Sequence, residues 1–232
     1  MTSAADVRAA LANESCFRSN YIDGAFVPAQ GGATYATISP FTEQVVHDLC
    51  PASDARDVEA AIAAARRAAD QGYARWGALT ATERASYVHA LAQKLQEQAP
   101  LLSALESSDM GKPIIDAGAD IARCAAEVEE IVKLAAELDA RQGQASFDSP
   151  DVAGSKRYDP MGVVACITPW NFPLLVTVQK LAPALTAGNT VVLKPSEYSP
   201  LTTMYAAKLC HEVGFPKGVV NFISVSADQP MS

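Results

Sequence analysis

The residues that could do chemistry follow two apolar runs of the chain. Asn171 comes shortly after the run 163–167, and Lys194 and Glu197 lie at the end of the run 190–193. Asn171 precedes a predicted helix, so its amide and the free N–H groups there could stabilise a developing oxyanion. A carboxylate and a lysine three residues apart could together hold the hydroxyls of a nucleotide ribose.

Each of these side chains also has a simpler explanation. Asn171 fits a residue that caps the helix or closes the loop. Trp170, which could wall a cofactor or substrate channel, fits a half-buried packing residue. Lys194 and Glu197 fit a solvated surface pair, which contributes at most about 1 kcal/mol to stability. For each residue considered alone, this simpler explanation is more frequent than the functional one.

The elements around these residues form a βαβ unit. Val163–Ile167 is a β-rich run, Pro173 suits the first position of a helix that runs to about Ala187, and Gly188 ends that helix. Two apolar strands joined by a helix are parallel with a right-handed crossover. Ligands bind outside the carboxyl ends of such strands. Trp170, Asn171, Lys194 and Glu197 all converge there. A shared site is therefore the better interpretation, and the fold class is α/β.

Other segments have the periodicity of shorter strands and of long helices. Tyr21–Val27 predicts a hairpin with Asp23-Gly24 as its turn. A helix capped by Ser53 or Asp54 has its apolar stripe at Val58, Ile62, Ala65 and Ala69. Further strands are predicted at 34–38, 44–49 and 218–223, and further helices from Thr80 or Thr82, at 101–107, at 114–138 and from Ser199 to Val213.

Composition divides the chain into three predicted parts. Residues 1–140 hold the hairpin and the helical block, and residues 160–232 hold the βαβ core. Between them, residues 141–159 are rich in Gln, Gly, Ser, Asp and Pro and keep no helical period over most of their length. We expect this segment to form a loop or an extended arm.

Charge and cysteine content exclude several classes of protein. The chain has 18 basic and 26 acidic residues, a net charge of −8, which argues against nucleic acid or an anionic membrane as partner. No apolar run is long enough to span a membrane. The five cysteines are widely spaced without a Cys/His cluster, so neither disulfides nor a metal site is indicated, and a cytoplasmic location fits best.

The usual dinucleotide fingerprint G-x-G-x-x-G does not occur in the chain. However, the segments Ile167-Thr168-Pro169-Trp170-Asn171-Phe172-Pro173 and Val191-Val192-Leu193-Lys194-Pro195-Ser196-Glu197 resemble the NAD(P)-dependent aldehyde dehydrogenase superfamily. Gly111-Lys112-Pro113 and Gly214-Phe215-Pro216-Lys217-Gly218 add to the likeness, which covers roughly residues 20–223. Several ordered motifs at family-like spacing make it specific.

The resemblance implies a fold and a set of roles. The fold would be the N-terminal part of the family's, a variant Rossmann parallel sheet with flanking helices, and residues 141–159 would be the arm with which subunits pair. Lys194 and Glu197 would hold the adenosine ribose, and Asn171 would be the side-chain half of an oxyanion hole. The remaining cofactor-binding positions would be Thr168, Pro169, Trp170 and Ser196.

In the complete enzymes of this family, an aldehyde, NAD(P)+ and water give a carboxylic acid. A cysteine thiolate attacks the aldehyde, hydride passes to the nicotinamide, and a glutamate activates water. The Gly-Gln-x-Cys and Glu-Leu-Gly-Gly segments of the family do not occur here, and Ser224-Val225-Ser226 stands where Gly-x-Gly is expected. The catalytic domain is therefore expected to be absent.

We therefore expect the cofactor-binding part of an aldehyde dehydrogenase, inactive as this fragment. The alternative is a non-catalytic short form that binds nucleotide or another subunit. An enzyme using Cys166 as nucleophile is a more distant third. The resemblance leans toward betaine-aldehyde or aminoaldehyde members and toward homo-oligomers, and Glu197 favours NAD over NADP. A sheet lacking its later strands would expose an apolar edge, so we expect poor stability or self-association.

Overall fold

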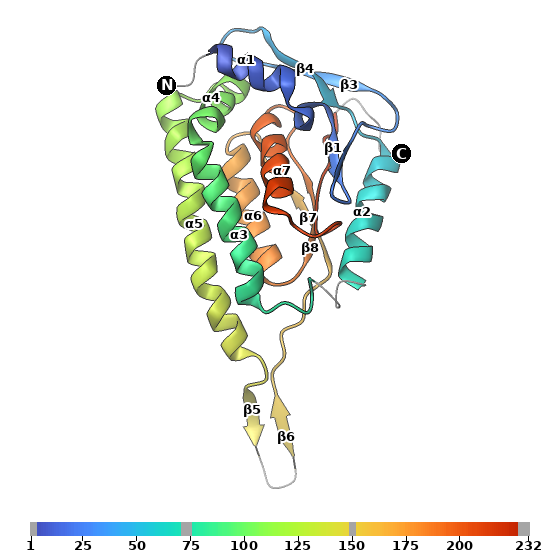
Figure 1. The fold of residues 1–232 in the computed structure, drawn as a ribbon, viewed down its shortest axis with the longest axis vertical. Helices are drawn as coiled ribbons and strands as arrows, with labels where there is room; N and C mark the ends of the chain where they lie inside the picture. The colour runs from blue at the N-terminus through green and yellow to red at the C-terminus, as the bar shows by residue number, and fades with distance from the viewer. Residues whose placement is uncertain (1–3, 71–75, 149–151, 227–232) are drawn as a thin grey trace.

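The computed structural model describes residues 4–70, 76–148 and 152–226. A five-stranded sheet with the order β2-β1-β9-β8-β7 lies at the centre, between helices on both faces (Figure 1). Strands β7 (Val163–Ile167), β8 (Thr190–Lys194) and β9 (Val220–Phe222) are parallel. Helix α6 (Pro173–Thr186) joins β7 to β8, and α7 (Leu201–Val213) joins β8 to β9. The predicted α/β core is confirmed.

The register of the parallel strands brings their carboxyl ends together. Ile167 at the end of β7 lies opposite Lys194 at the end of β8, and Leu193 lies opposite Phe222 in β9. Buried aliphatic side chains of β8, from Val191 to Leu193, place this strand in the interior. The loops that follow β7 and β8 therefore begin side by side.

The N-terminal hairpin belongs to the same sheet, which the sequence did not predict. Strands β1 (Asn20–Ile22) and β2 (Ala25–Val27) are antiparallel, and β1 pairs with β9 through Tyr21 and Phe222. The turn has positive φ at Asp23 and Gly24, as a two-residue hairpin turn requires. Its Asp23 N–H donates to Asn221 Oδ1 at 3.0 Å. Because β1 is antiparallel to β9, the sheet is mixed.

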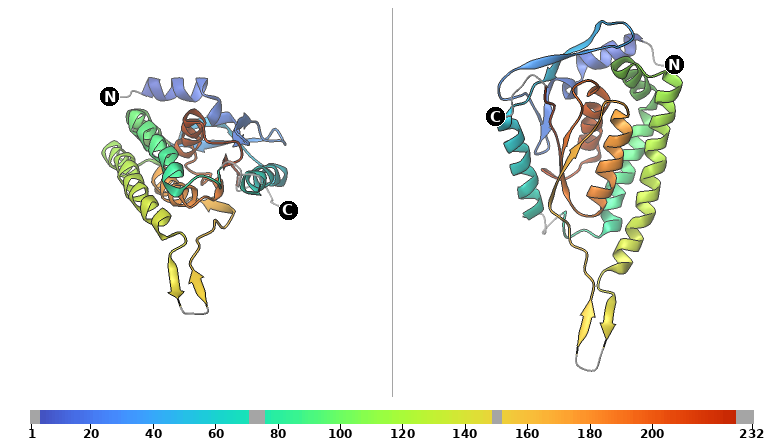
Figure 2. Two further views of the ribbon diagram at one scale, coloured as in Figure 1. Left: turned by 60° about the horizontal axis from the view of Figure 1, so that its bottom comes forward. Right: turned by 180° about the vertical axis from the view of Figure 1, so that it is seen from behind.

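One face of the sheet is covered by α2 (Ala55–Asp70) and the other by α6 and α7 (Figure 2). The predicted stripe of α2 was wrong at Ile62, whose side chain is 44% exposed. The helix instead buries Ala61, Ala64 and Ala65 against the sheet. Small side chains on this face allow a close approach, and Thr190 Oγ1 donates directly to the carbonyl oxygen of Ala65 at 3.0 Å.

A second layer of helices packs outside α6 and α7. It consists of α3 (Ala81–Glu97), α4 (Ala99–Met110) and α5 (Ile114–Arg141), and α1 (Ala4–Asn13) contacts α4. A capping box between Thr80 and Glu83 begins α3. Gly111, at φ 79°, ends α4 and reverses the chain into α5. The helix start predicted at Thr80 or Thr82 and the helices predicted at 101–107 and 114–138 therefore agree with the observed bounds to within three residues.

Two smaller pairs of strands lie outside the main sheet. A short 3-10 turn, η1 (Ser15–Arg18), contacts β4 (Val45–Pro51), which pairs with β3 (Thr34–Ile38). Strands β5 (Ala145–Asp148) and β6 (Ala153–Ser155) form an antiparallel ribbon that projects beyond the end of α5 (Figure 1). The segment predicted to be a loop or an extended arm contains this ribbon over its described residues.

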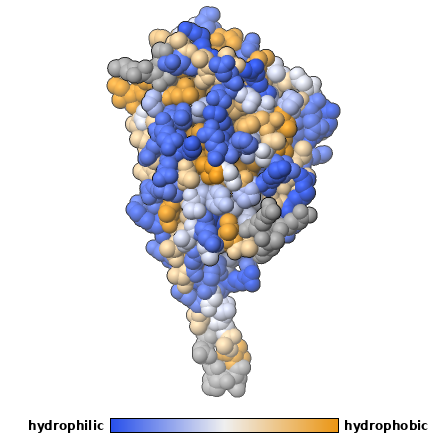
Figure 3. All heavy atoms as spheres, in the orientation of Figure 1, coloured by the Kyte–Doolittle hydropathy of each residue, from blue (hydrophilic) through white to orange (hydrophobic). Residues whose placement is uncertain are grey.

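The face of the molecule drawn in Figure 3 mixes hydrophilic and apolar residues. No helix among the described residues is both long and apolar enough to span a membrane. Residues 227–232, which belong to the predicted core segment 160–232, lie outside the described part.

Candidate functional site

The two loops that carry the candidate residues are joined at the edge of the sheet. The N–H of Thr168, the first residue after β7, donates to the carbonyl oxygen of Lys194 at 3.1 Å. Further along, Ser199 Oγ donates to the carbonyl oxygen of Trp170 at 2.8 Å. Ser199 is fully buried, so this second contact is shielded from water. The structure thus brings together the residues 168–171 and 194–197, and Ser199 is a link that the sequence did not reveal.

Asn171 lies exposed at the start of α6. The N-cap residue of that helix is Phe172, and no side chain caps it. The Asn171 amide makes no hydrogen bond with any other residue in the described part of the chain, so the helix-cap explanation does not apply. Pro173 occupies the first helical turn, and the next N–H groups of α6 have no partner within the helix. A side-chain amide and a helix N-terminus are therefore both available to an anionic oxygen.

Trp170 is not the half-buried packing residue of the simpler explanation. Its side chain is 56% exposed, and Pro169 before it is exposed as well. Within the described part of the chain, Trp170 is held by a hydrogen bond from Ser199 to its backbone. An exposed indole fixed through its backbone can line a channel without filling it.

Lys194 and Glu197 form a loose pair. Lys194 Nζ lies 3.5 Å from Glu197 Oε2 and 3.1 Å from the carbonyl oxygen of Pro195. The two side chains are 26% and 24% exposed, so they are neither sealed in the interior nor free in water. Ser196 is buried, and its hydroxyl accepts a hydrogen bond from the N–H of Tyr198 at 3.3 Å. Ser196 thus shapes the loop from which the lysine and the carboxylate project.

A buried carboxyl group supports this region from behind. Asp109, at the end of α4, accepts a hydrogen bond from the N–H of Leu201 at 2.9 Å and so fixes the start of α7. Burial raises the pKa of Asp109 to about 7, although the Leu201 contact opposes this shift. Asp109 also lines a cavity of about 310 Å³ together with Trp170 and Tyr198. No pattern in the sequence marks Asp109, because its partners lie far from it in the chain.

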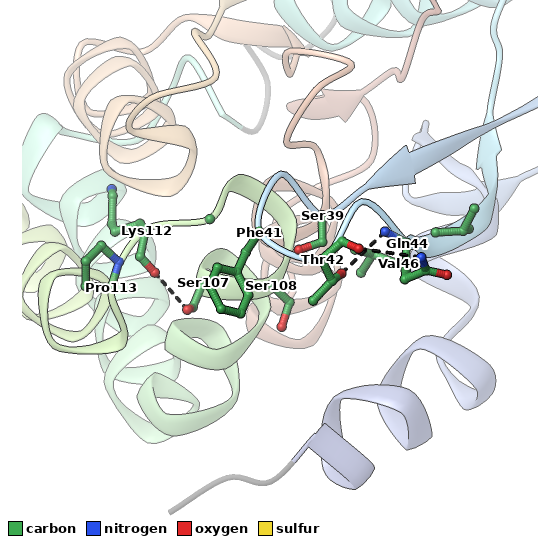
Figure 4. Close-up of a pocket in the computed structure, with 11 residues that line it drawn as sticks. Ser39, Phe41, Thr42, Gln44, Val46, Ser107, Ser108, Lys112 and Pro113 are labelled. Atoms are coloured by element: carbon green, nitrogen blue, oxygen red, sulfur yellow. Dashed lines mark hydrogen bonds between the residues drawn. The ribbon is translucent and has the colours of Figure 1, made fainter.

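A second cavity, of about 500 Å³, is lined mainly by the loop between β3 and β4 and by the turn between α4 and α5. Figure 4 shows hydroxyl-bearing residues on both sides of it, with Ser107 bonded to the carbonyl oxygen of Lys112. The ammonium group of Lys112 pairs with Glu106 and Asp120 rather than with any residue that lines this cavity. Apart from Lys112, whose ammonium is engaged by these carboxylates, no titratable residue of the described part of the chain lines this cavity, so we do not take it as the candidate site.

Comparison with known proteins identifies the family. Residues 26–230 match the model of the aldehyde dehydrogenase family. This chain belongs to that family. Aminoaldehyde dehydrogenase 1 of Pisum sativum, a peroxisomal protein, is 40% identical over 211 residues, which cover 89% of this chain and 41% of that protein. Betaine aldehyde dehydrogenase 1 of Oryza sativa subsp. japonica is 39% identical, with the same coverage.

Solved structures agree with this assignment. A point mutant of an aldehyde dehydrogenase from Bacillus cereus superposes with a TM-score of 0.89 at 37% identity, covering 99% of this chain and 45% of that chain. A betaine aldehyde dehydrogenase from Staphylococcus aureus in complex with NAD+ has a TM-score of 0.89 at 35% identity, covering 97% and 43%. The chain thus corresponds to the N-terminal portion of the family's fold, which is Rossmann-type here, and spans less than half the length of these relatives.

The residues of this aldehyde dehydrogenase chain fit a nucleotide cofactor. Thr168 is buried, and its Oγ1 has no hydrogen-bond partner in the described part of the chain. Such a hydroxyl costs stability unless a ligand or water satisfies it. It lies at the carboxyl edge of the sheet, beside the strand that ends in Lys194. The chemistry of this donor set, a hydroxyl, an ammonium and a carboxylate, suits a sugar with adjacent hydroxyls.

The cysteines of this family member do not resemble activated nucleophiles. All five are free and buried. Burial is the main cause that raises the pKa of Cys166, although Lys180 opposes it, and burial raises the pKa of Cys16 to about 12. A thiol with a raised pKa carries little thiolate near neutral pH, so the structure gives no support to Cys166 as the nucleophile.

Proposed function

We propose that this chain is the N-terminal, cofactor-binding part of a NAD(P)-dependent aldehyde dehydrogenase that oxidises an aldehyde to a carboxylic acid. The observation that carries the proposal is the meeting of two loops at one edge of a parallel sheet. One loop offers the free amide of Asn171, and the other offers Lys194 and Glu197. A nicotinamide cofactor would supply the hydride acceptor of the reaction.

In this proposal, Asn171 donates a hydrogen bond to the aldehyde oxygen as negative charge develops on it. Its amide is free, and the N-terminus of α6 adds a positive field at the same place. Removal of one donor of this kind from an oxyanion hole lowers kcat by about 10²–10³-fold. The nucleophilic cysteine and the general-base glutamate would come from segments that this sequence does not contain.

We assign the adenosine ribose to Lys194 and Glu197, with Thr168, Pro169, Trp170 and Ser196 around the cofactor cleft. The lysine and the glutamate are 3.5 Å apart, at the long limit of a hydrogen bond, so their mutual contact is weak. Lys194 would exchange its 3.1 Å hydrogen bond to the Pro195 carbonyl oxygen for one to a ribose hydroxyl. We propose NAD rather than NADP because Glu197 would repel a 2′-phosphate.

The substrate is proposed to be a betaine aldehyde or an aminoaldehyde. Two of the relatives named above carry these substrates in their names. The arm formed by β5 and β6 is proposed to pair subunits of a homo-oligomer, since an exposed two-stranded ribbon that leaves the body has little other packing. A cytoplasmic location is proposed from the five free cysteines.

The first test is NAD binding to the 232-residue chain by calorimetry, with Glu197→Gln beside it. We expect saturable binding that Glu197→Gln weakens about tenfold, because a hydrogen bond to a charged acceptor is worth roughly 1–1.5 kcal/mol more than one to a neutral amide oxygen. Glu130→Gln is the matched control, since Glu130 forms an ion pair with Lys133 on an exposed stretch of α5. Absence of NAD binding by a folded chain would contradict the assignment.

An aldehyde-oxidation assay on the same sample separates the two candidate functions. Binding without turnover agrees with a cofactor-binding part that needs a further catalytic part. The non-catalytic short form is the second candidate, and stable binding of a full-length aldehyde dehydrogenase subunit by this chain would favour it. Turnover by this chain alone would contradict both.

A further inference from the structure

Lys112 occupies the turn between α4 and α5, within the segment Gly111-Lys112-Pro113. Its ammonium donates to Glu106 Oε1 at 3.1 Å and to Asp120 Oδ2. The Lys112 side chain is only 9% exposed and that of Glu106 is fully buried. This lysine is therefore held from two helices in an environment from which water is largely excluded.

The same ion cluster extends to α7. Thr202 Oγ1 donates to Glu106 Oε2 at 3.3 Å, and both side chains are buried. Lys112 therefore has a fixed position relative to α4, α5 and α7. Rotation of its side chain away from this place would leave the buried carboxylate of Glu106 without its cation, which is costly.

The free face of this ammonium lies over an aromatic ring. Lys112 Nζ is 4.5 Å from the centroid of the Phe172 ring, within the range of a cation–π contact. Phe172 and Lys112 also line a common cavity of about 490 Å³ with Pro113, Asp116 and Asp120. The ring thus contacts the junction of α4 and α5.

Phe172 is also the residue that follows Asn171 and caps α6 with its backbone. Its carbonyl oxygen accepts the first helical hydrogen bond, from the N–H of Val176 at 3.0 Å. On the other side of Asn171, the backbone of Trp170 is fixed by Ser199. Asn171 itself has no side-chain partner among the described residues, so its direction depends on these two neighbours.

We propose that Lys112 is a positioning residue for Asn171. By holding the ring of Phe172, it fixes the backbone from which the Asn171 amide projects and thereby the direction in which that amide donates. The inference rests on the proposed function, because only there does Asn171 face an aldehyde oxygen. A purely structural lysine would stabilise the α4–α5 junction and leave Asn171 unchanged.

The test is a solution NMR measurement on the 232-residue chain with ¹⁵N-labelled asparagine, in which Asn171→Ala identifies the Asn171 side-chain amide signals. We expect Lys112→Met to shift or broaden these signals. Lys112→Arg should restore them toward their original positions, because a guanidinium keeps a cation over the ring. Since Lys112→Met leaves Glu106 unpaired, Glu106→Gln combined with Lys112→Met tests the same point without a buried bare charge.

Lys208→Met is the matched control. Lys208 also lies over an aromatic ring, that of Tyr205 at 5.0 Å, and also pairs with two carboxylates, those of Glu14 and Glu212, but it lies on α7. The substitution Lys208→Met should therefore leave the Asn171 signals in place. In a Phe172→Leu background, Lys112→Met should have no further effect on them, because the ring that transmits the contact is gone.

Unchanged Asn171 signals in folded Lys112→Met, or an equal effect of Lys208→Met, would overturn the proposal. A chain carrying Glu106→Gln and Lys112→Met that does not fold would overturn it too, since Lys112 would then be required for the fold itself. Absence of NAD binding with the expected NMR result would instead contradict the proposed function and leave the positioning role intact.

Discussion

Asp109 is a residue whose protonation the fold changes between about pH 4 and pH 7. It is completely buried, and its pKa rises from 3.8 to about 7, mainly through loss of hydration. Between these pH values the folded chain binds a proton that the unfolded chain has released. The free energy of unfolding therefore falls as the pH rises from about 4 to 7, by up to about 4 kcal/mol, and stays low above that.

Asp109→Asn should remove this part of the pH dependence. The amide oxygen can still accept from the N–H of Leu201, and no buried charge remains at high pH. Urea unfolding at pH 5 and pH 8 measures the effect. Between pH 5 and pH 8, the free energy of unfolding should fall less for the variant than for the original chain. Asp48→Asn, at an exposed position of β4, is the control and should follow the original chain.

Ser199 gives a second prediction at the scale of single residues. Ser199→Ala removes the buried hydrogen bond to the Trp170 carbonyl, which should lower the free energy of unfolding by about 1 kcal/mol. The Trp170 loop should also become looser, so acrylamide should quench its fluorescence more readily, while the buried Trp76 contributes little to quenching. Ser86→Ala, which removes an exposed contact to the Glu83 carbonyl, should change neither measurement.

The sequence could reveal some of these residues and not others, for a physical reason. Asn171, Lys194 and Glu197 come directly after strand ends, so the topology of parallel strands places them without any knowledge of packing. Ser199 and Asp109 act through contacts with residues 29 and 92 positions away. No local pattern marks such partners, and only the folded chain shows them.

At the scale of elements, α2 packs unusually close to the segment that precedes β9. Gly218 has φ +77°, and a Cβ added there would lie 2.5 Å from the backbone oxygen of Ala64. Gly214 has a similar φ of +82° at the end of α7, but nothing lies within 4 Å of its added Cβ. An alanine at Gly214 would therefore suffer backbone strain alone, whereas an alanine at Gly218 would suffer both backbone strain and steric overlap with α2.

Gly214→Ala should cost about 1 kcal/mol of unfolding free energy, because an alanine in the left-handed region is strained. Gly218→Ala should cost roughly 1–3 kcal/mol more, because α2 must move away from the sheet. Urea unfolding of the two variants measures the difference. Equal losses would show that the close approach of α2 at Gly218 does not limit stability.

Element boundaries followed from glycine, proline and capping residues, but two features of the elements did not. The buried face of α2 was wrong at Ile62 because alanines lie on all sides of the helix, and Ile62, its largest apolar side chain, faces solvent. The pairing of β1 with β9 was missed because it joins residues about 200 positions apart in the sequence. Periodicity within one segment contains no information about either.

At the scale of the whole molecule, β7 is an edge strand. Among the described residues it pairs only with β8, so one row of its backbone N–H and C=O groups has no partner strand. Ile167 on this strand is 66% exposed, and Ala165 is exposed too. The other edge of the parallel strands is covered by the hairpin, so the exposed edge expected from the sequence lies at β7.

Such an edge should let two copies of the chain pair, in line with the self-association expected from the sequence. Sedimentation velocity over a range of concentrations should show a reversible rise in mass. Ala165→Lys should shift this rise to higher concentration, because a charged side chain on an edge strand opposes pairing. Ala136→Lys adds the same charge at an exposed position of α5 and should leave association unchanged. If both substitutions reduced association equally, net charge and not the β7 edge would control it, and the arm formed by β5 and β6 would become the surface to test.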